Sequence, residues 1–292
     1  MDQCALSLCM IVKNAADALG RCLDSVDRLA DEIVVVDTGS TDRTLEIASR
    51  YGATVAAFDF TFVDFAAARN YALACAGGRW ILSLDADELL DAASIPLIRE
   101  AVERDENAGY YFERVNHHRD PQESTTDYVV RLFPNRPGYR YHGRVHETVD
   151  ASILSGGGRL RRTRIRVHHD FDRDPEMRRR RNLWYIGILE EEIARAPGDL
   201  SRLVFLGAEY HQLGRFDRAT EIAERIARLR PLDPEAHLHA GVYHLLYQPD
   251  RGRARTDFRE ALRLRPGYPE AQSFLQLMNE QDGSPRSAAE DS

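Results

Sequence analysis

Residues 80–88 read Trp80-Ile81-Leu82-Ser83-Leu84-Asp85-Ala86-Asp87-Glu88, a short apolar run followed at once by acidic side chains. An apolar run of this kind predicts a strand that is buried on both faces, as in a parallel sheet. Ligands bind in the crevice beyond the carboxyl ends of such strands. The acidic residues therefore stand where a functional site is expected.

The segments around this run alternate between strand-like and amphipathic patterns. We predict strands over 5–12, 32–36, 54–57 and 80–84, and helices over 16–28, 43–51 and 65–75. Later runs of aromatic and β-branched residues predict partly antiparallel strands over 110–115, 127–133 and 164–168. This order favours an α/β fold with a mainly parallel sheet.

An internal repeat follows the last strand signal. Pro197 and Pro231 are 34 residues apart, as are Gly207 and Gly241. This is the period of tetratricopeptide repeats, in which each unit is a pair of helices. We expect an α/β domain over 1–172, helical tetratricopeptide-like repeats over 173–281 and a disordered tail over 282–292.

The composition excludes some classes of protein. The chain has 292 residues, 43% of them hydrophobic, and a formal net charge of −8, which argues against a protein that coats nucleic acid. No run approaches the roughly 20 apolar residues that cross a bilayer, so we expect no transmembrane segment. The predicted location is the cytoplasm, either free or peripheral at the inner face of the membrane.

Asp85 and Asp87 are the sharpest candidates for a functional role. Two carboxylates one residue apart suit a hard cation such as Mg²⁺ or Mn²⁺, which fills its other positions with phosphate oxygens and water. An isolated pair of this kind is often only a charged turn. Here the preceding strand is apolar, and we expect the acid cluster to be too charged to bury without a cation.

Polar residues also follow the other strands. Asp37 ends an apolar strand beside Thr38 to Thr41, where backbone N–H groups suit an anion and the carboxylate suits a base or a ribose. A helix cap is the alternative for this turn. Lys13-Asn14 and Arg69-Asn70 supply charge and amides that could neutralise a diphosphate, although each of these residues could also be an ordinary exposed polar side chain.

Four motifs in order resemble those of family 2 glycosyltransferases. They are LCMIVKN at 8–14, VVVDTGSTD at 34–42, ARN at 68–70 and LDADE at 84–88. His146-Glu147, the stretch 168–171 and the helical repeats resemble the subgroup with C-terminal tetratricopeptide units, which includes enzymes acting on peptides and on lipopolysaccharide core sugars.

The resemblance implies a GT-A fold, which is Rossmann-like, and a binding site for a nucleotide-sugar. Asp37 would contact the nucleobase, and Asp85 and Asp87 would hold Mg²⁺ or Mn²⁺ on the diphosphate. The full set of expected donor-binding residues is Lys13, Asn14, Asp37, Gly39, Ser40, Arg69, Asn70 and Asp85. Relatives often have an acidic residue after the first-strand Asn, whereas this chain has Ala15.

Members of the family invert the anomeric centre, and a single displacement needs a general base near the acceptor. Glu147 is the first candidate because it follows a loop, and Glu88 and Asp170 are rivals. His168 is a candidate for a further metal ligand, with an ordinary strand-end histidine as the alternative.

We therefore expect an inverting, metal-dependent glycosyltransferase of the hexosyltransferase type. It would transfer a sugar from a nucleoside diphosphate, UDP in the first instance, to a glycan, lipid-linked or peptide acceptor. The alternative is an inactive GT-A and tetratricopeptide interaction protein, whose repeats bind a protein partner. A sugar nucleotidyltransferase is disfavoured, because no G-x-G-T-R-type loop follows the first strand.

Overall fold

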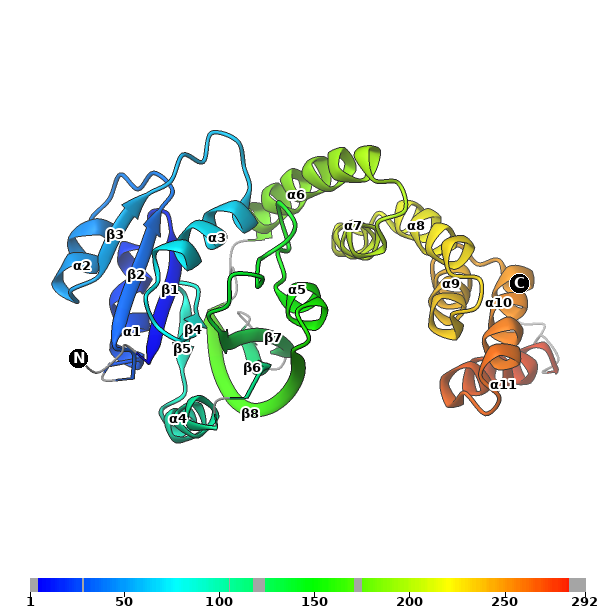
Figure 1. Cartoon of the computed structure of the whole chain (residues 1–292). Helices are drawn as coiled ribbons and strands as arrows, with labels where there is room; N and C mark the ends of the chain where they lie inside the picture. Colours follow the sequence, from blue (N-terminus) through cyan, green and yellow to red (C-terminus); the bar gives the residue numbers. More distant parts are fainter. Residues whose placement is uncertain (1–4, 28, 105, 118–123, 171–174, 284–292) are drawn as a thin grey trace. The chain divides into compact units, whose positions relative to one another are not determined.

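The computed structural model describes residues 5–27, 29–104, 106–117, 124–170 and 175–283 (Figure 1). The chain divides into two compact units, Met1–Pro175 and Glu176–Ser292, which we call the sheet unit and the helical unit. Within the described residues, no helix is both long enough and apolar enough to cross a membrane.

One sheet organises the described part of the sheet unit. Its eight strands lie in the order β3-β2-β1-β4-β7-β6-β8-β5. β1, β2, β3 and β4 are parallel, β7 runs antiparallel to β4 and β6, β8 is parallel to β6, and β5 is antiparallel to β8. The strands are β1 (Leu6–Val12), β2 (Glu32–Asp37), β3 (Thr54–Ala57), β4 (Trp80–Ser83), β5 (Glu88–Leu90), β6 (Ala108–His117), β7 (Thr125–Pro134) and β8 (Arg159–Asp170).

Helices cover both faces of this sheet. Successive side chains of β1 point to opposite faces, so Leu8 and Met10 join one buried cluster and Cys9 joins another. The first cluster receives side chains from α1, α2 and α4, and the second from α3 and α5. These helices are α1 (Ala16–Ser25), α2 (Thr44–Arg50), α3 (Phe65–Cys75), α4 (Ile95–Glu103) and α5 (Asp150–Ser155).

The expected α/β class with a mainly parallel sheet is confirmed. The structure adds four short elements that the sequence did not predict: β5, the 3-10 helix Ala92–Ser94, α4 and α5. β8 also begins at Arg159, earlier than the expected 164. Its apolar positions Leu160, Ile165 and Val167 are separated by arginines and by a register shift, which hides the two-residue period of a strand.

Stacked helices form the helical unit, as expected for tetratricopeptide-like repeats. α7 packs on α8, α8 on α9, α9 on α10, and α10 on α11. A Cβ added to Gly241 would meet the ring of Phe258 at 2.7 Å, so glycine allows α9 and α10 to approach closely. The helices are α6 (Pro175–Arg195), α7 (Leu200–Gln212), α8 (Phe216–Leu229), α9 (Pro234–Leu246), α10 (Arg251–Leu264) and α11 (Pro269–Gly283).

The end of α11 bears on the expected tail. The helix continues to Gly283, two residues into the segment 282–292 for which we predicted disorder. The remainder of that segment, 284–292, lies outside the described residues.

Candidate active site

The turn after β2 is closed by its own aspartate. The carboxylate of Asp37 accepts hydrogen bonds from the backbone N–H groups of Gly39, at 3.2 Å, and Ser40, at 3.0 Å. Gly39 has φ +103°, in the left-handed region that favours glycine. The parallel register pairs Val12 with Asp37, so the turn lies beside the end of β1.

Asn14 joins the end of β1 to this turn. Its backbone N–H donates to Oγ of Ser40 at 2.9 Å, and its side-chain oxygen accepts from the N–H of Thr41 at 2.7 Å. Lys13 is exposed next to it in the sequence. The structure thus brings together the polar residues that the sequence placed at the first two strand ends.

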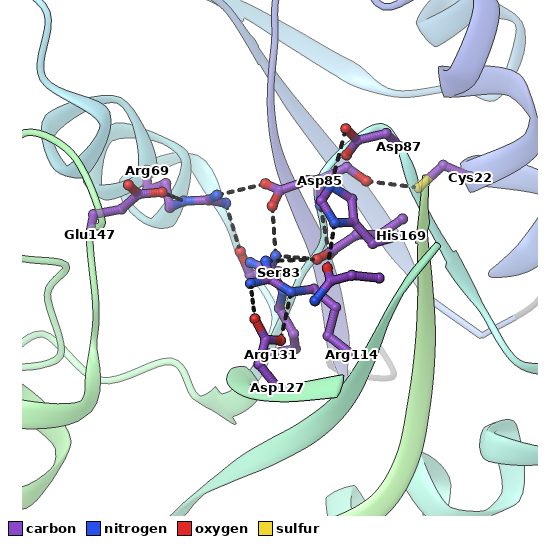
Figure 2. Close-up of polar contacts among 12 residues, drawn as sticks. Cys22, Arg69, Ser83, Asp85, Asp87, Arg114, Asp127, Arg131, Glu147 and His169 are labelled. Carbon is purple, nitrogen blue, oxygen red and sulfur yellow. Dashed lines mark hydrogen bonds and ion pairs between the residues drawn. The ribbon is translucent and has the colours of Figure 1, made fainter. Parts of the chain in front are cut away.

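Arg69 of α3 is the centre of the site (Figure 2). Only 7% of this residue is exposed, and each guanidinium nitrogen donates to a protein oxygen. Nε lies 2.6 Å from Oε1 of Glu147, Nη1 lies 3.2 Å from Oγ of Ser83, and Nη2 lies 2.6 Å from Oδ1 of Asp85. Burial by itself lowers the pKa of Arg69, but Asp85 and Glu147 raise that pKa well above its ordinary value.

A second buried arginine holds the other oxygen of Asp85. Nη2 of Arg131, on β7, lies 2.6 Å from Oδ2 of Asp85. Burial alone raises the pKa of Asp85, but the charges of Arg131 and Arg69 hold that pKa well below its usual range. Two arginines therefore offset the charge of Asp85, whose side chain is 30% exposed, and the expectation that the acid cluster needs a cation stays a prediction.

Glu88 lies next to Asp85 and Arg131 and is fully buried. It accepts hydrogen bonds from Arg131 and, at 3.1 Å, from the backbone N–H of Asp85, and it lies 3.7 Å from Arg114. Burial raises its pKa, and Arg131 opposes that rise. Such a buried carboxylate is poorly placed to meet an acceptor. The side chain of the other rival base, Asp170, lies outside the described residues.

Asp87 is paired with a histidine that the sequence did not single out. The Asp87 side chain is 48% exposed, and its Oδ2 lies 3.5 Å from Nε2 of His169. Nδ1 of His169 lies 2.8 Å from the amide oxygen of Asn116. Because a carbonyl oxygen only accepts, Nδ1 carries the hydrogen in this contact, and Nε2 is the ring nitrogen that faces Asp87.

His168, which the sequence named as a candidate metal ligand with an ordinary strand-end histidine as the alternative, is not brought to Asp87. Neighbouring strand residues point to opposite faces, and Nδ1 of His168 lies 2.9 Å from Nε2 of His117. Burial and the neighbouring His117 lower the pKa of His168. Among the described residues, no group of three or more possible metal ligands assembles.

The segment that carries Glu147 is fixed by the sheet unit itself. His142 and Thr148 exchange backbone hydrogen bonds of 2.9 and 3.2 Å, which closes the intervening residues into a loop. The side chain of Asn70 bonds both the N–H and the C=O of Tyr141, at 2.8 and 2.9 Å. Asn70, whose side-chain amide we expected to contact the nucleotide, thus anchors the start of this loop.

Comparisons with known proteins now give this arrangement a context. Residues 7–167 match the family model described as glycosyl transferase family 2. A TPR repeat-containing protein of Synechococcus elongatus is 43% identical over 152 residues, which cover 51% of this chain and 36% of that protein. The lipopolysaccharide core biosynthesis glycosyltransferase LpsC of Rhizobium meliloti is 31% identical over 153 residues, 49% of this chain and 56% of that protein.

A solved structure shares the fold. The crystal structure of S. aureus TarS 1–349 in complex with UDP-GlcNAc has a TM-score of 0.50 at 14% identity, and the match covers 93% of this chain and 92% of that one. The matched regions span only about a third to just over half of the two curated relatives named above. The family model itself covers more than half of this chain, including the four motifs and Glu147, and it ends just before His168 and His169. The chain therefore belongs to glycosyl transferase family 2.

Proposed function

We propose that this family 2 glycosyltransferase transfers a sugar from UDP, with UDP-GlcNAc as the first donor to test, to a hydroxyl group of a glycan, with inversion. The observation that carries the proposal is that one buried guanidinium, of Arg69, joins the donor-side carboxylate Asp85 to the candidate base Glu147. The name of the relative LpsC supports a glycan acceptor. Lipid-linked and peptide acceptors are the alternatives.

The donor side is formed by the ends of β1 and β2. The ordered turn at Asp37 and Ser40 and the cross-link from Asn14 form a fixed edge against which the nucleoside would bind. Lys13 is exposed beside them and would offer a positive charge to the diphosphate. A prearranged edge lowers the entropy lost on binding.

The residues present fit a divalent cation at Asp87. Mg²⁺ keeps several waters and takes only one or two carboxylates together with substrate phosphates, so a complete cage of protein ligands is not needed. Asp87 and His169 would hold the ion, and Asn116 orients the imidazole. Asp85 would lie next to the cation, and each of its two carboxylate oxygens is bonded to an arginine. When bound, the cation offsets the charge that develops on departing UDP.

Glu147 would perform the proton transfer. The acceptor oxygen forms a bond to the anomeric carbon from the face opposite UDP, while the bond from that carbon to the phosphate oxygen breaks. The hydroxyl proton passes to Glu147, and the electron pair of the broken bond leaves with UDP. One displacement inverts the anomeric centre, and the carboxylate needs to be near the acceptor only at that moment.

Release of UDP tests this function. The wild-type protein with Mn²⁺ is expected to release UDP from UDP-GlcNAc or another UDP-sugar when glycan acceptors are supplied, and the product is expected to have the inverted configuration by NMR. The alternative function, a ligand-binding protein with tetratricopeptide-like repeats, predicts that UDP binds but that no sugar nucleotide is turned over. Retained configuration would contradict the single displacement.

A further inference from the structure

Arg69 has a place in the site that differs from the role expected of it. The sequence placed this residue beside the diphosphate, yet each of its three nitrogens already donates to a protein oxygen (Figure 2). We propose that Arg69 is a positioning residue, which fixes the base Glu147 in relation to Asp85, and that it is not a direct ligand of the donor phosphates. This inference rests on the proposed function.

The guanidinium group of Arg69 is suited to bridge the carboxylates of Glu147 and Asp85, and we call this pair of contacts the bridge. It is planar and presents its N–H groups at fixed angles, so the two carboxylates bonded to it are also fixed in relation to each other. Nε and Nη2 of Arg69 reach Glu147 and Asp85, both at 2.6 Å. A lysine at this position would offer one compact charge on a flexible stem and would not fix that angle.

The bridge fixes the position of the Glu147 side chain, whereas the backbone of Glu147 is held in place by other contacts. The loop from His142 to Thr148 is closed by its own hydrogen bonds, and Asn70 anchors Tyr141. His146, directly before Glu147, has φ +50°, an uncommon conformation for a residue other than glycine. The backbone therefore brings Glu147 to the site, and Arg69 then determines where its carboxylate lies.

Asp85 is also held without Arg69. Arg131 keeps its own 2.6 Å contact to the other carboxylate oxygen. Loss of the bridge should thus leave the donor side largely intact and displace mainly Glu147. Misplacing a catalytic group by about 1 Å can cost roughly 10²-fold in rate, so the expected defect lies in turnover and not in donor affinity.

The test uses wild-type protein, Arg69→Lys, Glu147→Gln and the double variant. The reaction measured is hydrolysis of UDP-GlcNAc with Mn²⁺, in which water is the acceptor, and UDP affinity is measured by calorimetry. We expect Arg69→Lys to lower kcat about 10²-fold with KM and UDP affinity changed less than about threefold. The double variant should be no slower than Glu147→Gln, because Arg69 acts through Glu147.

Arg166→Lys is the matched control. Arg166 also uses two nitrogens on one carboxylate, Oε2 of Glu113, at 3.0 and 2.7 Å, but it lies outside the site. Its rate should equal that of the wild type. This control shows whether the rate falls whenever an arginine that contacts a carboxylate through two nitrogens is replaced, or only when Arg69 is replaced.

Two results would overturn the bridge. One is a tenfold or greater loss of UDP affinity in Arg69→Lys with kcat retained, which makes Arg69 a phosphate ligand. The other is an additive loss of rate in the double variant. A wild-type protein that neither binds UDP nor turns over any UDP-sugar contradicts the proposed function instead. In that case, urea unfolding of the wild type, the two single variants and the double variant tests whether Arg69 and Glu147 interact. If the loss of stability in the double variant equals the sum of the losses in the two single variants, the two residues act independently and the bridge is excluded.

Discussion

Nε2 of His169 lies 3.5 Å from Oδ2 of Asp87, at the carboxyl-end edge of the sheet. The pairing of β5 with β8 sets this relationship, because it places His169 opposite Glu88, the neighbour of Asp87. Asn116 fixes the ring from behind through Nδ1, at 2.8 Å. A carboxylate and an imidazole nitrogen therefore converge on one point, as the ligands of a divalent cation do.

Replacing Asp87 with asparagine is expected to weaken UDP binding in the presence of Mn²⁺ by about tenfold or more, since an amide carries no charge for the cation. The fold should survive, because the Asp87 side chain is 48% exposed. Calorimetry with Mn²⁺ and with EDTA, on wild type and variant, measures the effect. Equal affinity in all four titrations would leave Asp85 to Asp87 as an ordinary charged turn.

His169→Ala should lower the affinity for Mn²⁺, measured in the presence of UDP, by roughly 10- to 100-fold. The neighbouring His168→Ala is the control, because that side chain points to His117 and should leave the affinity unchanged. The two variants remove the same ring from adjacent positions of β8. The reverse pattern would support the role that the sequence gave to His168.

Glu147→Gln is expected to slow transfer by about 10² to 10⁴-fold, because the amide keeps the shape of the side chain but cannot accept the acceptor proton. UDP affinity should stay close to that of the wild type. Steady-state rates at saturating UDP-sugar, together with calorimetry, test both statements. Nearly normal turnover would transfer the role of base to Asp170, since Glu88 is fully buried.

The strand ends could be predicted because they depend on local pattern. The run 80–84 is apolar except for Ser83 and the acids follow it directly, so the position of Asp85 and Asp87 was evident without tertiary contacts. The same holds for Asp37, the last residue of β2. The general pattern of α/β elements followed by helical pairs was predicted for the same reason.

The partners of these residues could not be predicted, because they come from distant segments. Asp85 is neutralised by Arg69 and Arg131, which are 16 and 46 residues away in the sequence. One signal was present: Arg131 interrupts the apolar run Val129-Val130-Arg131-Leu132-Phe133, and a charge in a buried strand needs a partner. The contact of His169 with Asp87 depends on the register in which β8 pairs with the three-residue strand β5. No local pattern in the sequence reveals that register.

A buried histidine joins three helices of the helical unit. Nδ1 of His244, on α9, lies 2.8 Å from Oδ2 of Asp257 on α10, and Nε2 lies 2.9 Å from Oε1 of Glu224 on α8. Carboxylate oxygens only accept, so both contacts are satisfied when both ring nitrogens carry hydrogen. Arg253 also contacts Glu224, at 2.8 Å. This cluster links consecutive helical pairs through charge as well as through apolar packing.

The cluster makes the stability of the helical unit depend on pH. Burial by itself raises the pKa of Glu224, but His244 and Arg253 hold that pKa below its ordinary value of 4.5. A carboxylate with a lowered pKa in the folded state contributes stability that is fully present above its unfolded pKa and is lost as pH falls through the folded pKa. The resistance of α8, α9 and α10 to urea should therefore decrease as the pH falls below about 4.5.

Glu224→Gln removes this contribution and should cost about 1.5 to 3 kcal/mol near neutral pH, the usual range for hydrogen bonds to charged groups. Its stability should also change less than that of the wild type between about pH 6 and about pH 3.5. Glu221→Gln, on the same helix, is the control, because Glu221 is exposed and pairs only at the surface with Arg218. Pulse-labelling hydrogen exchange in urea, followed in peptides from α8 to α10, reports on these helices alone. A pH dependence that is the same in wild type and Glu224→Gln would show that the cluster does not control the acid sensitivity of the repeats.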